Sequence, residues 1–406
     1  MSTPSSVLVV GASAAGLATA EALRRKGYVG ELTLLGDEPH VPYDRPPLSK
    51  QVLGGVWVPE RAHLRVPEVL DALDARFVLG DAAVSLDVPT RTVGTASGLS
   101  LRADAVVLAT GVRPRALPDQ AGLAGVHVLR TLDDALALRA DLLTCKRLVV
   151  VGDGVLGAEV AATARTMGVE VTLAGPQRAP LAMQLGPLVS GLLGELHAER
   201  GVDLRLGVAV SGLTAADGRV TGVRLADDEV LPADVVVVAL GAIPATEWLA
   251  GSGLRVDNGV VCDAHCRAAE GIYAVGDVAR WHHDRLDSLL RLENRTNATE
   301  QAVLVADNVL GADRRYAPVP YFWTDQFDAK LQIHGVLAAD ADVAVVEGSV
   351  DARRFVALFH RGGEVVGVLG WNMAKQSRLH RQRHLVELED FAGSHVTAAE
   401  VEKADF

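Results

Sequence analysis

Cysteines and aromatic residues are scarce in this sequence. It has three cysteines among 406 residues, and aromatic side chains make up 4% of it. Three cysteines are too few for a disulfide framework. Cys262 and Cys266 are four positions apart with no second ligand pair beside them, which argues against a zinc site or a redox-active dithiol. We therefore expect reduced cysteines, as in a cytosolic protein, and no metal centre.

Long apolar runs are missing as well. The longest, residues 235–243, is far shorter than the roughly 20 residues that span a bilayer, and the N-terminus has no signal-peptide pattern. The formal net charge of −12 argues against nucleic acid as a general partner. A hydrophobic content of 49% with 40 glycines instead fits a cytoplasmic α/β protein of two or three domains.

The stretch Ser6–Leu23 predicts a buried strand, a glycine turn and a helix of small residues. Gly11 permits the tight turn and Gly16 permits close packing of helix on strand, so the helix N-terminus can face a pyrophosphate. Ser13 stands where a dinucleotide-binding fingerprint has its second glycine. Taken alone, this motif is therefore equally compatible with an ordinary strand-to-helix turn.

The same pattern returns in the middle of the chain. A predicted strand leads into a complete fingerprint at Gly152, Gly154 and Gly157, followed by a helix to about residue 167 and another strand. A second repeat relates residues 109–114 to residues 239–244, since each contains a Gly and ends in Pro after a strand. Two fingerprints in strand–turn–helix context predict two dinucleotide-binding units.

Further polar residues suit a dinucleotide. Asp37 and Glu38 follow the second predicted strand, where an acid binds a ribose hydroxyl, although they lie beyond the expected spacing of about 20 residues. The proline-rich loop after them offers Arg45 and Lys50, and its alternative interpretation is a rigid surface loop. Asp277 ends another strand at the head of a predicted helix, where its carboxylate is placed to accept hydrogen bonds from a polyhydroxyl ligand.

From about residue 316 the sequence becomes aromatic and β-rich, which indicates a separate C-terminal α+β unit. Its strands are predicted near Leu331, Val343, Phe355 and Val365. Four aromatic residues open it: Tyr321, Phe322, Trp323 and Phe327. They fit either a core cluster or a flat wall for a planar ring system.

Together these segments resemble the FAD-dependent, NAD(P)H-dependent ferredoxin reductases of the type related to putidaredoxin reductase and the reductases of aromatic-ring dioxygenases. The resemblance covers nearly the whole chain, and the order and spacing of its motifs are specific. Its carriers are residues 6–23, 42–50, 109–114, 152–159, 239–244, 273–279, 291–301 and 321–326.

The resemblance implies a fold like that of glutathione reductase, in the α/β class. Two Rossmann-like dinucleotide-binding domains, for FAD and NAD(P), precede a smaller α+β C-terminal domain. We expect FAD-binding segments at residues 1–112 and 241–318, an NAD(P)-binding domain at 113–240 and the C-terminal domain at 319–406.

The resemblance also assigns cofactor-binding residues. The FAD pyrophosphate would lie at the first fingerprint, Arg45 and Lys50 would flank the flavin, Asp277 would hold its ribityl chain, and Glu293 with the Phe322–Trp323 pair would close the ring pocket. The full predicted set is Gly11, Ser13, Ala14, Ala15, Gly16, Asp37, Glu38, Arg45, Lys50, Ala82, Thr110, Gly111, Arg130, Gly152, Gly154, Val155, Leu156, Gly157, Glu159, Arg178, Gly241, Gly276, Asp277, Glu293, Asn294, Arg295, Phe322 and Trp323.

No Cys-x-x-x-x-Cys follows the first fingerprint, so the redox-active disulfide of related disulfide reductases is missing. The resemblance then implies that NAD(P)H delivers hydride from nicotinamide C4 to flavin N5. The flavin passes single electrons to an iron–sulfur ferredoxin that serves a cytochrome P450 or a ring-hydroxylating oxygenase. Lys50 and Glu159 are the predicted catalytic pair. Their alternative interpretations are a surface lysine and a helix-start glutamate favoured by the helix dipole.

One departure from the family bears on cofactor choice. NADH-specific members carry an acid at the end of the second strand of the inserted domain, where this chain has Gly175 followed by Arg178. Glycine has no side chain to bind a ribose hydroxyl, and Arg178 could meet a 2′-phosphate. The sequence therefore predicts that NADPH is accepted at least as readily as in acid-bearing relatives.

Because ferredoxins are usually acidic, a reductase with net charge −12 needs a locally positive docking face. Arg378, Arg381 and Arg383 are the candidates, extended by Arg291 and Arg295, and a solvated basic face is the alternative. Two other functions stay open: an NAD(P)H oxidase or rubredoxin or quinone reductase, and a non-enzymatic nicotinamide-sensing flavoprotein. We expect a monomer or a homodimer.

Overall fold

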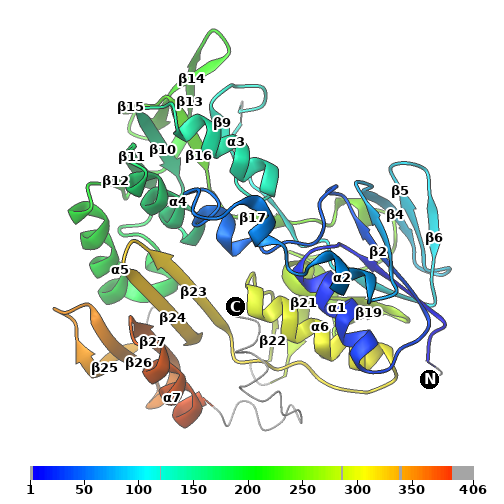
Figure 1. Cartoon of the computed structure of the whole chain (residues 1–406). Coiled ribbons are helices and arrows are strands. Elements are labelled where there is room, and N and C mark those ends of the chain that lie inside the picture. The colour runs from blue at the N-terminus through cyan, green and yellow to red at the C-terminus, as the bar shows by residue number, and fades with distance from the viewer. Residues whose placement is uncertain (1–2, 119, 285–286, 338–340, 386–406) are drawn as a thin grey trace.

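The computed structural model describes residues 3–118, 120–284, 287–337 and 341–385. It has two Rossmann-like lobes, here called the N-terminal and middle lobes, and a smaller C-terminal domain that lies beside the middle lobe (Figure 1). This confirms the predicted fold class. The last residues of the predicted C-terminal domain, 386–406, lie outside the described part of the chain.

The N-terminal lobe is built on a six-stranded sheet. Its central strand β1 pairs in parallel with β2 on one side and β7 on the other, and all of Val7–Val10 is buried. Helices α1 (Ala14–Arg25) and α6 (Arg295–Val309) pack against each other, and α2 spans Pro67–Asp71. In spatial order the strands are β19 (Arg267–Ala269), β20 (Ile272–Ala274), β7 (Ala105–Leu108), β1 (Ser6–Val10), β2 (Glu31–Gly36) and β3 (Arg76–Leu79).

Two small sheets complete this lobe. One consists of β4 (Ala83–Asp87), β5 (Thr92–Thr95) and β6 (Ser100–Arg102), and the other of β18 (Val260–Cys262), β21 (Ala279–His283) and β22 (Ser288–Leu290). The second sheet corrects one prediction: Asp277 does not begin a helix. A 3-10 turn at Gly276–Val278 leads directly into β21, whose residues alternate between buried and half-buried, a period of two that fits a strand.

The middle lobe repeats the same construction. Strand β10 pairs in parallel with β11 and β16, as β1 does with β2 and β7. Helices α3 (Leu132–Leu142), α4 (Val155–Thr166) and α5 (Ala182–Glu199) belong to it. The sheet order is β12 (Asp203–Leu206), β11 (Glu170–Gly175), β10 (Arg147–Val151), β16 (Val235–Val238) and β9 (Val126–His127), and β13 (Val210–Ala216), β14 (Arg219–Leu225) and β15 (Val230–Pro232) form a separate meander.

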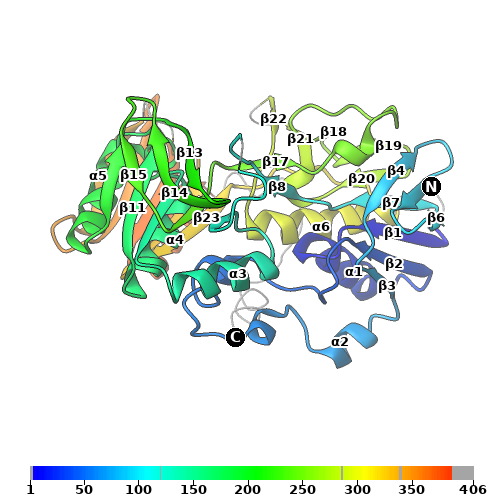
Figure 2. The same cartoon turned by 90° about the horizontal axis from the view of Figure 1, so that it is seen from above.

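The two repeated Gly–Pro segments pair with each other. Strand β8 (Val112–Pro114) leaves the N-terminal lobe, β17 (Ala242–Pro244) returns to it, and the two form an antiparallel ribbon. The hydroxyl of Thr110 donates to the carbonyl of Ala245 at 2.8 Å beside it. The internal repeat seen in the sequence is therefore the double connection between the lobes (Figure 2).

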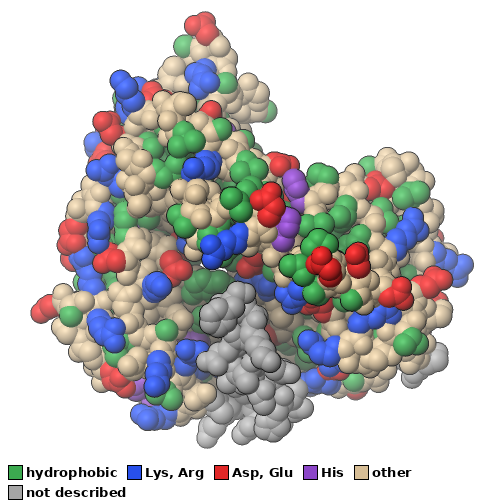
Figure 3. All heavy atoms as spheres, viewed as in Figure 1, with side chains coloured by type: hydrophobic (Ala, Val, Ile, Leu, Met, Phe, Trp, Pro, Cys, Tyr) green, Lys and Arg blue, Asp and Glu red, His purple; other side chains and the backbone are tan. Residues whose placement is uncertain are grey.

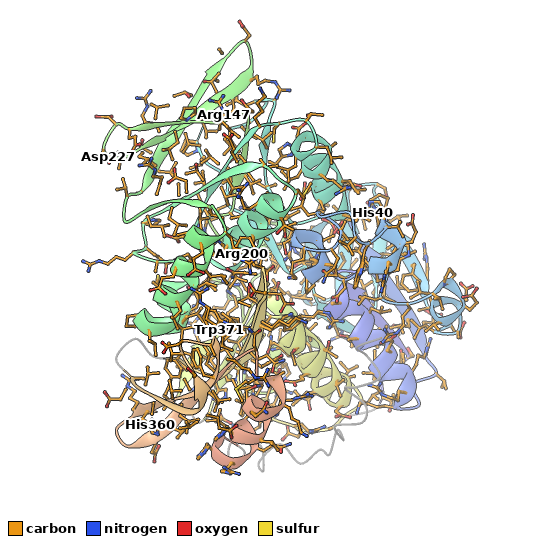
Figure 4. The ribbon with its side chains drawn as sticks, turned by 60° about the vertical axis from the view of Figure 1, so that its left-hand side comes forward. His40, Arg147, Arg200, Asp227, His360 and Trp371 are labelled. Atoms are coloured by element: carbon orange, nitrogen blue, oxygen red, sulfur yellow. The ribbon has the colours of Figure 1, made fainter. Side chains whose placement is uncertain are left out.

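The C-terminal domain is an antiparallel sheet with a helix on each face. Helix α5 of the middle lobe packs on one face, and α7 (Ala374–Leu385) packs on the other. Trp371, labelled in Figure 4, is buried in the first of these layers and stacks on Phe355. The strand order is β23 (Tyr321–Gln326), β24 (Ala329–Gly335), β27 (Glu364–Trp371), β26 (Arg354–Arg361) and β25 (Asp342–Ser349). The four strands predicted after residue 330 are confirmed.

Two ion pairs fix the placement of this domain on α5. Arg200, which follows α5, pairs with Asp328 at 2.7 Å (Figure 4), and Arg353 holds Glu199 with both of its terminal nitrogens. No helix in the described ranges is long and apolar enough to span a bilayer.

The buried ring of His334 on β24 makes the C-terminal domain sensitive to acid. It stacks on Tyr321 and is 4% exposed, and burial, aided by Arg381 and Arg378, lowers its pKa from 6.5 to about 3. The unfolded chain therefore binds a proton between about pH 6.5 and 3 that the folded chain excludes, so stability falls as the pH drops through this window.

We expect the change His334→Phe, which keeps a ring for the stack, to remove this loss. Between pH 7.5 and 5.0 the wild type should lose about 2 kcal/mol of unfolding free energy more than the variant does. Urea denaturation of both proteins at both pH values measures it, with His360→Phe on β26 as the matched control. A stability difference between the two proteins that does not change with pH would contradict the prediction.

Candidate functional site

The first glycine loop leaves the N-terminus of α1 open. Gly11 has φ +120°, and a Cβ there would lie 2.2 Å from the carbonyl oxygen of Ala109. Gly16 packs equally closely on the carbonyl of Gly11. The N-cap Ser13 makes no side-chain hydrogen bond to the helix, and the first turn, which starts at Ala14 and Ala15, carries no acid. The helix therefore keeps free N–H groups and an uncompensated dipole, as a pyrophosphate site requires.

The second glycine loop has the same geometry. Gly152 has φ +119°, with a Cβ position 2.2 Å from the carbonyl oxygen of Ala239, and Gly157 packs on the carbonyl of Gly152. The N-cap of α4 is Gly154, which has no side chain and open space around its Cβ position, and the first turn from Val155 and Leu156 has no acid. Each lobe thus presents one uncapped helix N-terminus.

The end of β2 carries an ionic cluster. Glu38 accepts a hydrogen bond from the Tyr43 hydroxyl and pairs with Arg45 at 2.8 Å, and Arg45 also donates to the carbonyl of Arg130 at 2.6 Å. Burial, with Glu38 adding to it, raises the pKa of Tyr43. Asp37 is exposed. Of the two predicted ribose ligands, Glu38 is therefore committed to Arg45 and Tyr43, whereas Asp37 faces solvent.

Asp277 lies next to this cluster. Its carboxylate is 3.5 Å from Arg130 Nη2, and burial raises its pKa while the Arg130 cation opposes that rise. The N–H of Gly276 is bound by Gln301 at 2.8 Å, which fixes the turn. Because its Arg130 contact is long, the Asp277 carboxylate keeps acceptor capacity for a ligand hydroxyl.

The start of α6 has one unmet acceptor. Asn294, its N-cap, makes no cap hydrogen bond, and its buried Oδ1 has no partner among the described residues. Arg291 instead pairs with Glu293 at 2.6 Å, and Arg295 pairs with Asp44 at 2.6 Å. An unpaired buried oxygen fits a polyhydroxyl ligand, as does the Asp277 carboxylate, so these residues suit the ribityl chain of FAD.

Two predicted cofactor-binding glycines, Gly111 and Gly241, lie beside the ribbon of β8 and β17 that connects the lobes. Gly111 has φ +67° with Arg130 Nη2 as the nearest atom to its Cβ position, at 3.0 Å, and Gly241 has φ +84° and nothing within 4 Å. Ala82 is half-buried, and its carbonyl accepts the N–H of Ala96. Both glycines lie where the chain crosses between the lobes.

A buried carboxylate joins all three parts of the molecule. Glu159, on α4 of the middle lobe, receives Lys50 Nζ at 2.8 Å and Ser49 Oγ at 2.6 Å from the N-terminal lobe, both on Oε2. Thr324 Oγ1, on β23 of the C-terminal domain, donates to Oε1 at 2.9 Å. The side chains of Lys50 and Glu159 are 13% and 7% exposed, so this is an ion pair shielded from water. The sequence predicted the pair but missed Ser49 and Thr324.

A second row of hydrogen bonds orients the Thr324 hydroxyl. Gln326 Nε2 donates to Thr324 Oγ1 at 3.0 Å, and Gln326 Oε1 accepts from His197 Nε2 at 2.7 Å. His197 is fully buried, and burial lowers its pKa, so it is neutral with its proton on Nε2. The Thr324 hydroxyl is thus left with its proton pointing at Glu159. The signal was present in the sequence, since residues 324 and 326 share one face of a strand.

The aromatic residues at the start of β23 divide between its two faces. Phe322 and Phe327 pack against the core that α5 covers, whereas Trp323 stacks on Tyr321 with ring centroids 5.9 Å apart, and both of these rings are half-buried. The cluster therefore serves both as core and as an aromatic surface.

The end of β11 differs from what its sequence indicates. Gly175 is buried and Arg178 is exposed. Next to Gly175 lies the carboxylate of Asp153, a residue of the second fingerprint that was not among the predicted site residues.

One cysteine supports this arrangement structurally, because Cys266 Sγ accepts a hydrogen bond at 3.2 Å from Nε2 of Gln301, whose Oε1 holds the N–H of Gly276. All three are free, and Cys266 is fully buried, which raises the pKa of its thiol to about 12. A thiolate is therefore scarce at neutral pH, as expected if no dithiol chemistry operates.

Comparison with known proteins identifies the family of this chain. Residues 5–302 match the family model of the pyridine nucleotide-disulphide oxidoreductases, and residues 321–399 match that of the reductase C-terminal domain. The chain is 39% identical to rhodocoxin reductase of Rhodococcus erythropolis over 93% of its own length and 88% of the relative's. It is 37% identical to putidaredoxin reductase of Pseudomonas putida over 91% and 89% of the two chains.

Solved structures agree as well. A ferredoxin reductase for the CYP199A2 system from Rhodopseudomonas palustris superimposes with a TM-score of 0.90 at 35% identity, covering 98% of this chain and 99% of that one. The putidaredoxin reductase of a covalent complex with putidaredoxin gives 0.89 at 33% identity over 99% of both chains. The chain therefore belongs to the FAD- and NAD(P)H-dependent pyridine nucleotide-disulphide oxidoreductases, among their ferredoxin reductases.

Proposed function

We propose that this protein is a ferredoxin reductase that draws electrons from NAD(P)H and delivers them to an iron–sulfur ferredoxin of a cytochrome P450 or ring-hydroxylating oxygenase system. The observation that carries the proposal is the buried Lys50–Glu159 pair, which joins the two lobes, each of which also has one uncapped helix N-terminus after a glycine loop. Related reductases that bear these names support the partner class.

Bound FAD supplies the chemistry that a protein side chain cannot: it accepts a hydride and releases single electrons. The chain's own residues bind and orient. The N–H groups at the start of α1 would hold the FAD pyrophosphate, and Asp277 with Asn294 would receive ribityl hydroxyls. The α4 N-terminus would hold the nicotinamide cofactor's pyrophosphate. Lys50, oriented by Glu159, would place a positive charge beside the reacting ring.

The reaction sequence is tested by stopped-flow mixing. We expect NADH or NADPH to reduce the bound flavin rapidly, and the reduced protein to lose its electrons to a ferredoxin faster than to oxygen. Rapid oxygen consumption without any partner would instead identify an oxidase. Flavin reduction too slow to support turnover would point to a nicotinamide-sensing protein.

Thr324 allows a sharp test of the Glu159 cluster. Thr324→Val keeps the shape but removes one of three donors to the carboxylate, which raises the free energy of its charged, oriented form. We expect the rate of flavin reduction at saturating cofactor to fall about tenfold, or about 1.4 kcal/mol.

The control variants for this experiment are Thr324→Ser, which keeps the hydroxyl and should restore the rate, and Thr221→Val on the distant β14 hairpin. Unchanged reduction kinetics in Thr324→Val would remove Thr324 from the site. Tm measurements on all three proteins separate this effect from a loss of stability.

The docking face is proposed on α7. Arg378 and Arg383 are exposed, and half-buried Arg381 lies near the ring of His334 and the Tyr321–Trp323 stack. Arg291 and Arg295 are held by Glu293 and Asp44, which partly offsets their charge. An acidic partner would therefore meet the cations of α7 beside an aromatic surface.

Charge reversal of this face should weaken binding of the ferredoxin without affecting the earlier steps of the reaction. We expect Arg381→Glu with Arg383→Glu to raise the ferredoxin KM more than tenfold at low salt, and less at high salt, because screening weakens the lost attraction. Flavin reduction by the nicotinamide cofactor should not change. The matched control is Arg219→Glu with Arg224→Glu on β14, at the opposite end of the molecule (Figure 1). An unaltered ferredoxin KM would place the docking face elsewhere.

A further inference from the structure

The end of β11 has no room for a side chain. A Cβ on Gly175 would lie 2.3 Å from Oδ2 and 2.5 Å from Cγ of Asp153. Asp153 stands between the first two glycines of the second fingerprint, so its carboxylate reaches across from the β10–α4 loop to the end of the neighbouring strand. The space that an acid at position 175 would use is therefore filled by an acid from position 153.

This carboxylate is rigidly held. Oδ2 accepts the backbone N–H of Gln177 at 2.8 Å, and Oδ1 accepts Nε2 of the same residue at 2.6 Å. Gln177 is fixed in turn, because its Oε1 accepts the N–H of Met183 at 2.7 Å. Asp153 is 5% exposed, and none of the ion pairs among the described residues includes it. A carboxylate has about four acceptor positions, so capacity for a ligand hydroxyl remains.

We propose that Asp153 is the residue that selects the nicotinamide cofactor. It would supply, from the glycine loop, the negative charge that dinucleotide-binding units of this kind place at the end of their second strand to accept a ribose hydroxyl. A fixed and unneutralised carboxylate at this place favours the free 2′-hydroxyl of NADH and repels the 2′-phosphate of NADPH. The inference rests on the proposed function, since it assumes that the α4 N-terminus binds the cofactor.

The cation of Arg178 would attract the 2′-phosphate of NADPH, but its effect is weaker than that of Asp153. Its side chain is exposed, so solvent and salt screen its charge, whereas the carboxylate of Asp153 is shielded from both. The balance therefore favours NADH, whereas Gly175 and Arg178 read from the sequence alone predict that NADPH is accepted at least as readily as in acid-bearing relatives.

Binding measurements on the FAD-loaded protein test this directly. Isothermal titration with NAD⁺ and NADP⁺, and with the fragments 5′-AMP and 2′,5′-ADP, gives a ratio of Kd values for ligands with and without the 2′-phosphate. We expect the wild type to favour the ligands without it at least tenfold, and Asp153→Asn to reduce this ratio at least tenfold. Asp203→Asn, a change to an exposed acid on neighbouring β12, should leave the ratio within twofold.

The salt dependence of the wild type provides a second measurement that needs no variant. Repulsion by the shielded carboxylate of Asp153 predicts a ratio of Kd values that changes little with ionic strength, whereas attraction by the exposed Arg178 predicts that NADP⁺ loses affinity relative to NAD⁺ as ionic strength rises. A ratio unaltered in Asp153→Asn, or a loss of NADP⁺ affinity with salt that Arg178→Gln abolishes, would overturn the role of Asp153. Binding of neither nucleotide would overturn the nicotinamide site itself and with it the proposed function.

Discussion

The buried carboxylate of Glu159 is the constraint on which the site depends. A charge shielded from water is costly unless donors surround it, and breaking such a cluster leaves that cost uncompensated. Here the donors are Lys50 and Ser49 from one lobe and Thr324 from the C-terminal domain. The carboxylate is therefore satisfied only when all three parts are assembled, so the C-terminal domain contributes directly to the Glu159 cluster.

The two lobes have the same construction at their glycine loops. In each, a glycine passes within van der Waals distance of the carbonyl that precedes a Gly–Pro segment, and an uncapped helix begins just beyond. The two segments then pair as β8 and β17, so the glycine loops are joined through a short ribbon. The notch between the lobes lies above this ribbon (Figure 3). Duplication of one supersecondary unit thus places two helix N-termini near one boundary.

The sequence predicted the elements that depend on neighbouring residues in the chain. Runs of β-branched residues and paired fingerprints located β1, β10 and their helices to within a few residues. It did not predict α5, because Gly186 and Pro187 interrupt its pattern and are accommodated by a kink. Nor could it predict contacts between distant segments: Thr324 is 165 positions from Glu159, and only β23 packing on α4 brings them together. The role proposed for Asp153 could not be predicted for a related reason, since it depends on the contact of its carboxylate with the end of the neighbouring strand β11.

One strand explains why the C-terminal domain can serve two purposes. Side chains alternate along β23, so Thr324 and Gln326 face α4 and α5, while Tyr321 and Trp323 face the side that α7 covers. A slip of one residue against β24 would exchange the two faces and disconnect both. The stack of Tyr321 on its cross-strand neighbour His334 opposes that slip. The register of β23 therefore keeps the Glu159 cluster on one face of the strand and the Tyr321–Trp323 stack beside the proposed docking surface on the other.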